Sequence, residues 1–338
     1  MKSKGILIVV GVVLAVGMLI PDLGCNTVFA QTISLKVSAH HTQTNPYVVL
    51  LEKAMDLIQK RYSGTIKYEY HPAKSLYNLK KGSEAVMDGL VDIASFKAGY
   101  FLQKFGLVAD IANMPYNYPF DAFAQHSRDQ GGFFEWASAA YERNGVKLLS
   151  TPVATPLGII TTKPVRKLED MKGMLMRCVP GAAAKGFELL GAEPVFISSG
   201  EIYEGLLRGT IDGSNTSIVS AASTKLYEAA KYYTLCDYTT TGIEYAINTR
   251  RYKSLPADLQ KIVGEAFEEA EREFFKSIPA VTGRDRKVME NAGVEFITLD
   301  KAELARWQAA MEALYKQMAA KYGADWERFT RIRNELQK

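Results

Sequence analysis

The residues that follow the N-terminal segment begin with an alternation of apolar and polar side chains, which predicts a β-strand. Ile33, Leu35 and Val37 share one face, and polar residues fill the positions between them. Residues 45–61 open with Asn-Pro and then carry apolar residues at spacings of three and four, which predicts a helix. Alternation returns over residues 66–70. This β-α-β order predicts a largely parallel sheet and an α/β fold.

Two short stretches of the chain resemble each other. Residues 84–92 read EAVMDGLVD and residues 204–212 read EGLLRGTID, with Glu, Gly and Asp at the same offsets. Each stretch predicts a short amphipathic helix that ends at glycine and leads into a strand through an aspartate turn. A match this short also arises by chance. We interpret it as the trace of two similar α/β lobes, which would bind a ligand between them at the carboxyl ends of their strands.

The last third of the chain has the spacing of helices. Apolar residues recur three and four positions apart over 259–274, and again over 304–318 after a capping-box pattern at Asp300 and Glu303. The second segment is rich in leucine, methionine and tryptophan, which suits either core packing or a cofactor pocket. We interpret it as core packing.

The first thirty residues have the layout of a secretory signal peptide. Two lysines precede an apolar run over residues 6–20, and Val-Phe-Ala then ends at Ala30. A run of about 15 residues is short for a membrane span, which needs roughly 20. We predict cleavage after Ala30 and a mature protein in the periplasm. An uncleaved anchor and lipid attachment at Cys25 are the alternatives.

Composition and missing motifs argue against several function classes. The net charge is +4 over 338 residues with both signs interspersed, so nucleic acid is not an expected partner. No His-Glu-x-x-His or Gly-x-Ser-x-Gly pattern occurs, and no strand leads into Gly-x-Gly-x-x-Gly. We therefore expect no enzyme, metal site or cofactor, and an exported enzyme with a dispersed site is the weaker alternative. Cys178 and Cys236 are either bridged or buried as thiols.

Arg177 stands at the end of an apolar run. Lys172-Gly173 predicts a turn, residues 174–176 read as a buried strand, and Arg177 terminates that strand at the edge of the sheet. A guanidinium offers two parallel charge-assisted hydrogen bonds to a carboxylate. On the residues alone, Arg177 binds a ligand or forms a structural salt bridge.

At this segment the chain resembles the DctP-type solute receptors, which are the extracytoplasmic binding subunits of tripartite ATP-independent periplasmic (TRAP) transporters. The resemblance rests on LEDMKGMLMRCVPG at 168–181, LGAEP at 190–194, GEIY at 200–203 and RGTIDG at 208–213. It implies a two-lobed, periplasmic-binding-protein-like α/β fold with a ligand cleft between the lobes and long bracing helices. The expected divisions are the signal peptide 1–30, an N-terminal lobe of 31–154 plus about 242–281, and a second lobe of 155–241 plus the C-terminal helices of about 282–338.

The resemblance also implies the site and the partners. Arg177 corresponds to the family's carboxylate-clamping arginine, and residues 213–217 correspond to another wall of the pocket in the second lobe. The first lobe would contribute His40 and His41, the loop around Lys74 and the segment 96–101, although the histidines are also acceptable as surface residues. The ligand would be a small organic acid, and the partners would be the small and large membrane permease subunits; we expect a monomer. A chemosensory receptor of the same fold is the alternative. The candidate ligand-binding residues are Arg177, Asn215, Thr216, His41, Lys74, Phe101 and Thr155.

The chain departs from the family pattern in ways that bear on the ligand. Leu157 occupies the register where many of these receptors, notably those for sialic acid, carry another arginine, and Ser199 replaces a frequent phenylalanine. A second carboxylate buried beside Leu157 would lie unpaired, which is costly. We therefore predict a monocarboxylate, hydroxylated, keto or aromatic, with a C4-dicarboxylate as the alternative.

Overall fold

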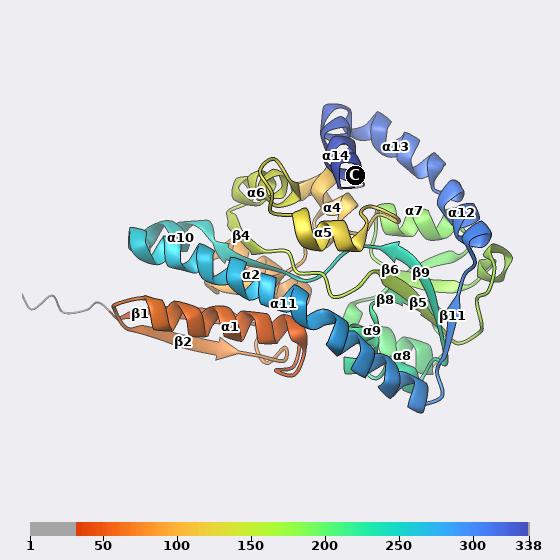
Figure 1. Ribbon diagram of the computed structural model, residues 1–338, viewed down its shortest axis with the longest axis horizontal. Coiled ribbons are helices and arrows are strands. Elements are labelled where there is room, and N and C mark those ends of the chain that lie inside the picture. Colours follow the sequence, from red (N-terminus) through yellow and green to blue (C-terminus); the bar gives the residue numbers. More distant parts are fainter. Residues whose placement is uncertain (1–31, 337–338) are drawn as a thin grey trace, which may run out of the picture.

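Two β-sheets covered by helices form the framework of the protein (Figure 1). The computed structural model describes residues 32–336, so the predicted signal peptide, its cleavage site and Cys25 lie outside the described residues. The first sheet has the strand order β2-β1-β3-β10-β4, and β1 pairs in parallel with β2 and β3. Its strands are β1 (Ile33–Ser38), β2 (Ile66–His71), β3 (Ile93–Phe96), β4 (Val146–Ser150) and β10 (Glu244–Asn248).

The second sheet has the strand order β11-β9-β5-β8-β6-β7. β6 pairs in parallel with β7 and β8, whereas β5 is antiparallel to both β8 and β9. Its strands are β5 (Leu157–Thr161), β6 (Leu175–Cys178), β7 (Glu193–Phe196), β8 (Gly213–Thr216), β9 (Tyr232–Thr239) and β11 (Glu295–Thr298). The two sheets confirm the predicted two-lobed α/β fold.

The first predicted elements are confirmed. α1 (Pro46–Arg61) connects the parallel strands β1 and β2, and the Asn45 side chain caps it by accepting a hydrogen bond of 3.1 Å from the Tyr47 backbone N–H. The two similar sequence stretches also form similar units. α2 (Leu79–Asp88) leads into β3, and α8 (Ile202–Leu207) leads into β8.

Two segments that connect the first sheet to the second are in contact with each other. β4 leads to β5 through residues 151–156, and β9 leads to β10 through residues 240–243. A Cβ atom placed on Gly242 would come within 1.7 Å of the Pro152 carbonyl oxygen, so a side chain at this position would force the two connections apart. Glycine is therefore required at this crossing between the lobes.

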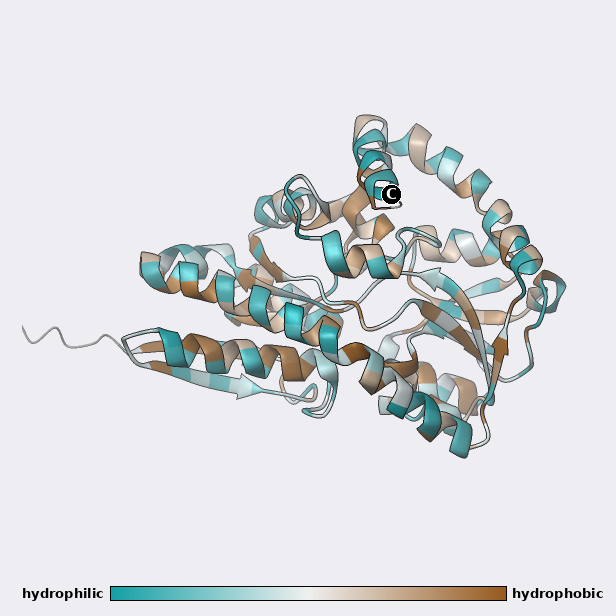
Figure 2. Cartoon of the chain, viewed as in Figure 1, coloured by the Kyte–Doolittle hydropathy of each residue, from teal (hydrophilic) through white to brown (hydrophobic). Residues whose placement is uncertain are grey.

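The long helix α11 (Ala257–Asn291) braces both lobes. Its first half lies beside α1, and its C-terminal end reaches the second sheet (Figure 1). Phe267 and Phe274 belong to the hydrophobic core under the first sheet, whereas Met289 belongs to a core of the second. Figure 2 shows hydrophobic residues along the middle of α11, where the helix passes from one lobe to the other. This arrangement agrees with the predicted bracing helix.

The C-terminal helices pack into a core that contains residues from both sheets. Trp307, Met311 and Leu314 are fully buried there, which confirms the predicted core role of the stripe over residues 304–318. The Phe329 ring lies 5.4 Å from that of Tyr118, on the first-lobe side. The boundaries of the lobes stay a prediction.

The remaining α-helices are α3 (Leu102–Phe105), α4 (Leu107–Ile111), α5 (Phe120–His126), α6 (Phe133–Arg143), α7 (Ala182–Leu189), α9 (Ile218–Ser223), α10 (Thr249–Ser254), α12 (Lys301–Ala310), α13 (Glu312–Tyr322) and α14 (Ala324–Glu335).

Cys178 and Cys236 are both buried and free, so the first of the two alternatives for them, a bridge, does not occur. Between residues 32 and 336, no helix combines the length and the hydrophobicity that a membrane span needs.

Candidate ligand-binding site

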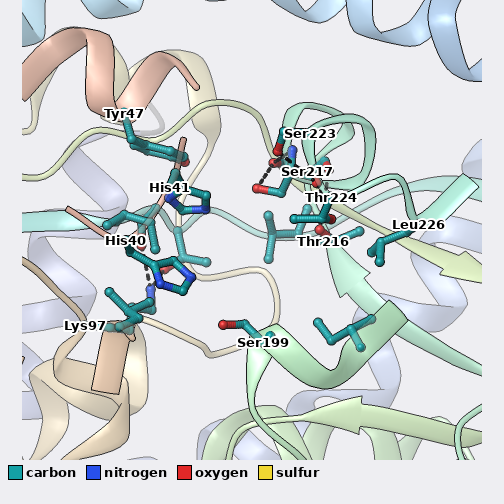
Figure 3. A pocket seen from close by; sticks show the side chains of 18 of the residues that line it. His40, His41, Tyr47, Lys97, Ser199, Thr216, Ser217, Ser223, Thr224 and Leu226 are labelled. Carbon is teal, nitrogen blue, oxygen red and sulfur yellow. Dashed lines mark hydrogen bonds between the residues drawn. The ribbon is translucent and has the colours of Figure 1, made fainter. Parts of the chain in front are cut away.

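A cavity of about 470 Å³ lies between the two sheets, at the carboxyl ends of four strands. His40 and His41 follow β1, Lys97 follows β3, Arg177 lies near the end of β6, and Thr216 ends β8. Side chains that follow parallel strands collect at one edge of a sheet, so both sheets present polar groups to the space between them. Figure 3 shows the histidines and Lys97 on one side of the cavity, and Thr216 with the hydroxyl groups of Ser199 and Ser217 on the other.

Arg177 brings a buried positive charge to the cavity. Its side chain is 7 % exposed, and its Nε donates a hydrogen bond of 3.0 Å to the Ile197 carbonyl oxygen. Its Nη2 atom is buried without a hydrogen-bond partner among residues 32–336, and no carboxylate of those residues forms an ion pair with it. A buried guanidinium in this state is costly unless an anion reaches it. Arg177 therefore presents a buried positive charge with an unsatisfied donor to the cavity.

Five of the seven predicted residues come together around this cavity. Arg177, Asn215, Thr216, His41 and Lys74 all line it, as do Leu157 and Ser199.

Phe101 and Thr155 do not line the cavity. The Phe101 ring lies 6.2 and 6.4 Å from the rings of Phe96 and Phe105, measured between centroids. It therefore packs against the hydrophobic core that contains these two residues. Thr155 lies in the crossing between the sheets, where its hydroxyl is buried without a partner among the described residues.

The two histidines form a neutral polar wall. The His40 and His41 rings meet edge to face with centroids 4.7 Å apart, and His41 stacks on Tyr47 at 5.7 Å. Burial lowers the pKa of His40 to about 2, with smaller contributions from His41 and Lys74. Burial, and then the Lys74 charge, lowers the pKa of His41 to about 4. Both rings are uncharged at neutral pH, so they offer hydrogen bonds to a ligand without adding charge.

These shifts predict a loss of stability in mild acid. The unfolded histidines have a pKa near 6.5, so between that value and about pH 4 the unfolded chain binds protons that the folded chain does not. The free energy of unfolding should therefore fall as the pH drops below 6.5, by up to about 1.4 kcal/mol per pH unit for each histidine. Urea unfolding at pH 7.5, 6.5 and 5.5 measures this. A His40→Gln, His41→Gln variant should show a flatter dependence, and an equal slope would contradict the assignment.

Lys74 lies on a strained loop that reaches across the cavity. Ala73 and Lys74 both adopt the left-handed backbone region, with φ of 56° and 62°, and their amides bond to the carbonyls of His41 and Ala39. A Cβ on Gly200, which belongs to the opposite side, would lie 3.6 Å from the Lys74 Nζ. Strained backbone of this kind persists where surrounding contacts fix it, often beside ligands.

Lys97 lies in the expected pocket segment 96–101 but was not singled out there, although the signal that identified Arg177 applies to it equally. Lys97 directly follows the buried apolar strand β3, as Arg177 terminates the apolar run of β6. It is buried and lines the cavity. On the other wall, Ser217 ends the expected segment 213–217, and the residues beyond it that were not expected include the hydroxyl-bearing Ser220, Ser223 and Thr224. Within the part of the chain that the structure describes, no cluster of His, Cys, Asp and Glu side chains could hold a metal ion.

Comparison with known proteins identifies the family. Residues 37–322 match the bacterial extracellular solute-binding protein family 7, DctP. The chain belongs to this family. It is therefore an extracytoplasmic solute-binding receptor and not an enzyme, as the resemblance predicted.

Similar proteins of this family cover nearly the whole receptor. The C4-dicarboxylate-binding periplasmic protein DctP of Rhodobacter capsulatus is 24 % identical over 88 % of this chain and 89 % of that protein. The 2,3-diketo-L-gulonate-binding periplasmic protein YiaO of Escherichia coli is 25 % identical, over 78 % and 81 %. The crystal structure of a TRAP periplasmic solute-binding protein from Desulfovibrio salexigens with bound orotic acid aligns with a TM-score of 0.82, at 23 % identity over 90 % of this chain and 98 % of that one.

Proposed function

We propose that the receptor is the periplasmic binding subunit of a TRAP transporter, and that it captures a small organic acid whose carboxylate docks on Arg177. The observation that carries the proposal is the state of that side chain. Its guanidinium is buried, lacks a direct ionic partner among residues 32–336, and lines a cavity between the lobes. A carboxylate supplies both the missing charge and the missing acceptors.

The ligand is a monocarboxylate that also carries hydroxyl or keto oxygens. Leu157 and Val179 give part of the wall an apolar character, and the uncharged histidines and serine hydroxyls offer hydrogen bonds to neutral oxygens. The similar proteins include examples of both ligand classes: one is named for C4-dicarboxylates, one is named for 2,3-diketo-L-gulonate, and one contains orotic acid.

Capture and release need no chemical step. The two lobes are joined by the touching connections at 151–156 and 240–243 and by α11, which is the layout of a hinge. Some contacts with the ligand form only when the two lobes close around it. These contacts shift the population of the receptor toward the closed form. The closed receptor, exported through its signal peptide and acting as a monomer, then delivers the acid to the small and large permease subunits.

A panel of matched acids tests the ligand class. Two pairs differ only by a carboxylate in place of the terminal methyl group: 2-hydroxybutyrate and malate, and 2-oxopentanoate and 2-oxoglutarate. In calorimetric titrations we expect the receptor to bind at least one monocarboxylate ten times more tightly than its diacid. Mass spectrometry of the acid that co-purifies should identify a monocarboxylate. Tight binding of malate with negligible binding of every monocarboxylate would contradict the proposed ligand.

A further inference from the structure

A second buried cation, Lys97, borders the ligand cavity. Its Nζ donates hydrogen bonds to the Thr241 hydroxyl and, at 2.9 Å, to the Gly242 carbonyl oxygen. An ammonium has three N–H donors, so among the described residues one donor is left for a ligand. Lys97 and Arg177 are close enough for the arginine charge to lower the pKa of Lys97, in addition to the larger effect of burial. Taken alone, this cation would make the cavity a site for two carboxylates.

Glu244 lies behind Lys97, away from the ligand. It is the first residue of β10, opposite Phe96 of β3, and its Oε1 is 3.8 Å from the Lys97 Nζ. Glu244 does not line the ligand cavity; it borders a separate space of about 20 Å³. The connection that carries Gly242 separates the two spaces and contributes to both walls. A ligand can therefore reach Lys97 but not Glu244.

When the two groups hold one proton between them, the pair carries no net charge wherever that proton lies. Burial raises the pKa of Glu244 and lowers that of Lys97, while each charge favours the other. If the proton stays on the lysine, the pair is +1 and −1; if it moves to the glutamate, both groups are neutral. With both histidines uncharged and Lys74 exposed to solvent, Arg177 is then the buried charge of this wall that has no direct ionic partner among the described residues. Hydrogen bonds with Ser198 lower the pKa of the exposed Glu201, and the Arg177 charge lies near enough to lower it further.

We propose that Glu244 is a specificity-determining residue that cancels the charge of Lys97, and so restricts the ligand to one carboxylate. Lys97 then forms its remaining hydrogen bond with a neutral hydroxyl or keto group at the far end of the acid. A second carboxylate in that position would meet a compensated cation with a carboxylate 3.8 Å behind it. This inference rests on the proposed function, because it assumes that the first carboxylate binds Arg177.

The decisive variant is Glu244→Gln, which keeps the shape of the side chain and removes its charge. Lys97 then becomes an uncompensated cation, so the ratio of diacid to monocarboxylate dissociation constants should fall at least tenfold for the matched pairs. Displacement titrations at millimolar diacid measure weak binding. Glu265→Gln, an equal change on the exposed face of α11, should leave the ratio unchanged. Thermal unfolding verifies that the variants fold, and an unchanged ratio in folded Glu244→Gln would overturn the inference.

Lys97→Met is a second test that does not depend on the first variant. It should weaken the binding of hydroxy and keto monocarboxylates about tenfold or more. The ratio of the diacid to the monocarboxylate dissociation constant should change less than threefold. A selective loss of diacid binding would show that Lys97 clamps a second carboxylate in the wild type, and would overturn the inference. Failure of the proposed function gives a different result: the wild type would then bind no acid of the panel, or would bind it without Arg177.

Discussion

Replacing Arg177 by methionine should lower the affinity for the acid ligand by roughly 30-fold to several thousand-fold, or about 2–5 kcal/mol, as expected when one partner of a buried charged pair is removed. The ligand carboxylate would enter the cavity without the guanidinium that replaces its hydration. The Ile197 carbonyl would lose a hydrogen bond, which is a local effect. Isothermal titration calorimetry with the acid that co-purifies with the wild type measures the loss.

The controls for this variant separate binding from folding. Arg208→Met removes an arginine that is exposed beside Glu204 on α8, so it should keep the wild-type affinity. The unliganded Arg177→Met protein should unfold at or above the wild-type temperature, because the substitution removes a buried charge that has no ionic partner among residues 32–336. Wild-type affinity in folded Arg177→Met would refute the role of the arginine.

The second large effect concerns stability. Arg128→Met should lower the free energy of unfolding by about 3–5 kcal/mol, because it strands the buried Glu271 carboxylate of α11 without its cation. Glu271 also accepts a hydrogen bond of 2.6 Å from the Thr151 backbone N–H, and Arg128 donates one of 2.7 Å to the Leu149 carbonyl oxygen. The cluster therefore fastens the bracing helix to the start of the crossing between the sheets. Urea unfolding at pH 7 measures the loss.

A double substitution shows whether the effect comes from the stranded charge. Arg128→Met with Glu271→Leu removes both partners, and it should recover much of the stability that the single change loses. Arg272→Met, which breaks an exposed pair with Glu268 on the same helix, should change the stability by less than about 1 kcal/mol. A small effect of Arg128→Met, or no recovery in the double variant, would contradict this account of the cluster.

The local pattern of the sequence predicts much of the fold. The β1-α1-β2 opening, the two similar helix-strand units and the buried stripe of the C-terminal helices follow from periodicity and capping residues, which act over a few positions. Arg177 follows from the same logic, since a charge at the end of a buried strand must lie at the edge of a sheet. The two similar stretches suggested the two lobes, and the resemblance to the DctP family added the bracing helices and the carboxylate ligand.

Contacts between distant segments could not be predicted in this way. Lys97 meets a partner 147 positions later at Glu244, and Arg128 meets Glu271 after 143 positions, so no local pattern records either pair. Phe101 was proposed as a pocket residue by its place in the family pattern, but the short α3 that follows it turns the ring toward Phe105. An aromatic residue near a cavity can pack in the core or contact the ligand, and its residue type does not show which. The packing of the surrounding residues decides where the ring lies.

The most direct test of the account is a crystal structure of the receptor with the monocarboxylate that it binds most tightly. The account predicts the ligand between the two sheets, with both carboxylate oxygens about 2.7–3.2 Å from guanidinium nitrogens of Arg177 and a hydroxyl or keto oxygen at the Lys97 Nζ. A carboxylate bound elsewhere in the cavity, with Arg177 still unpartnered, would contradict it.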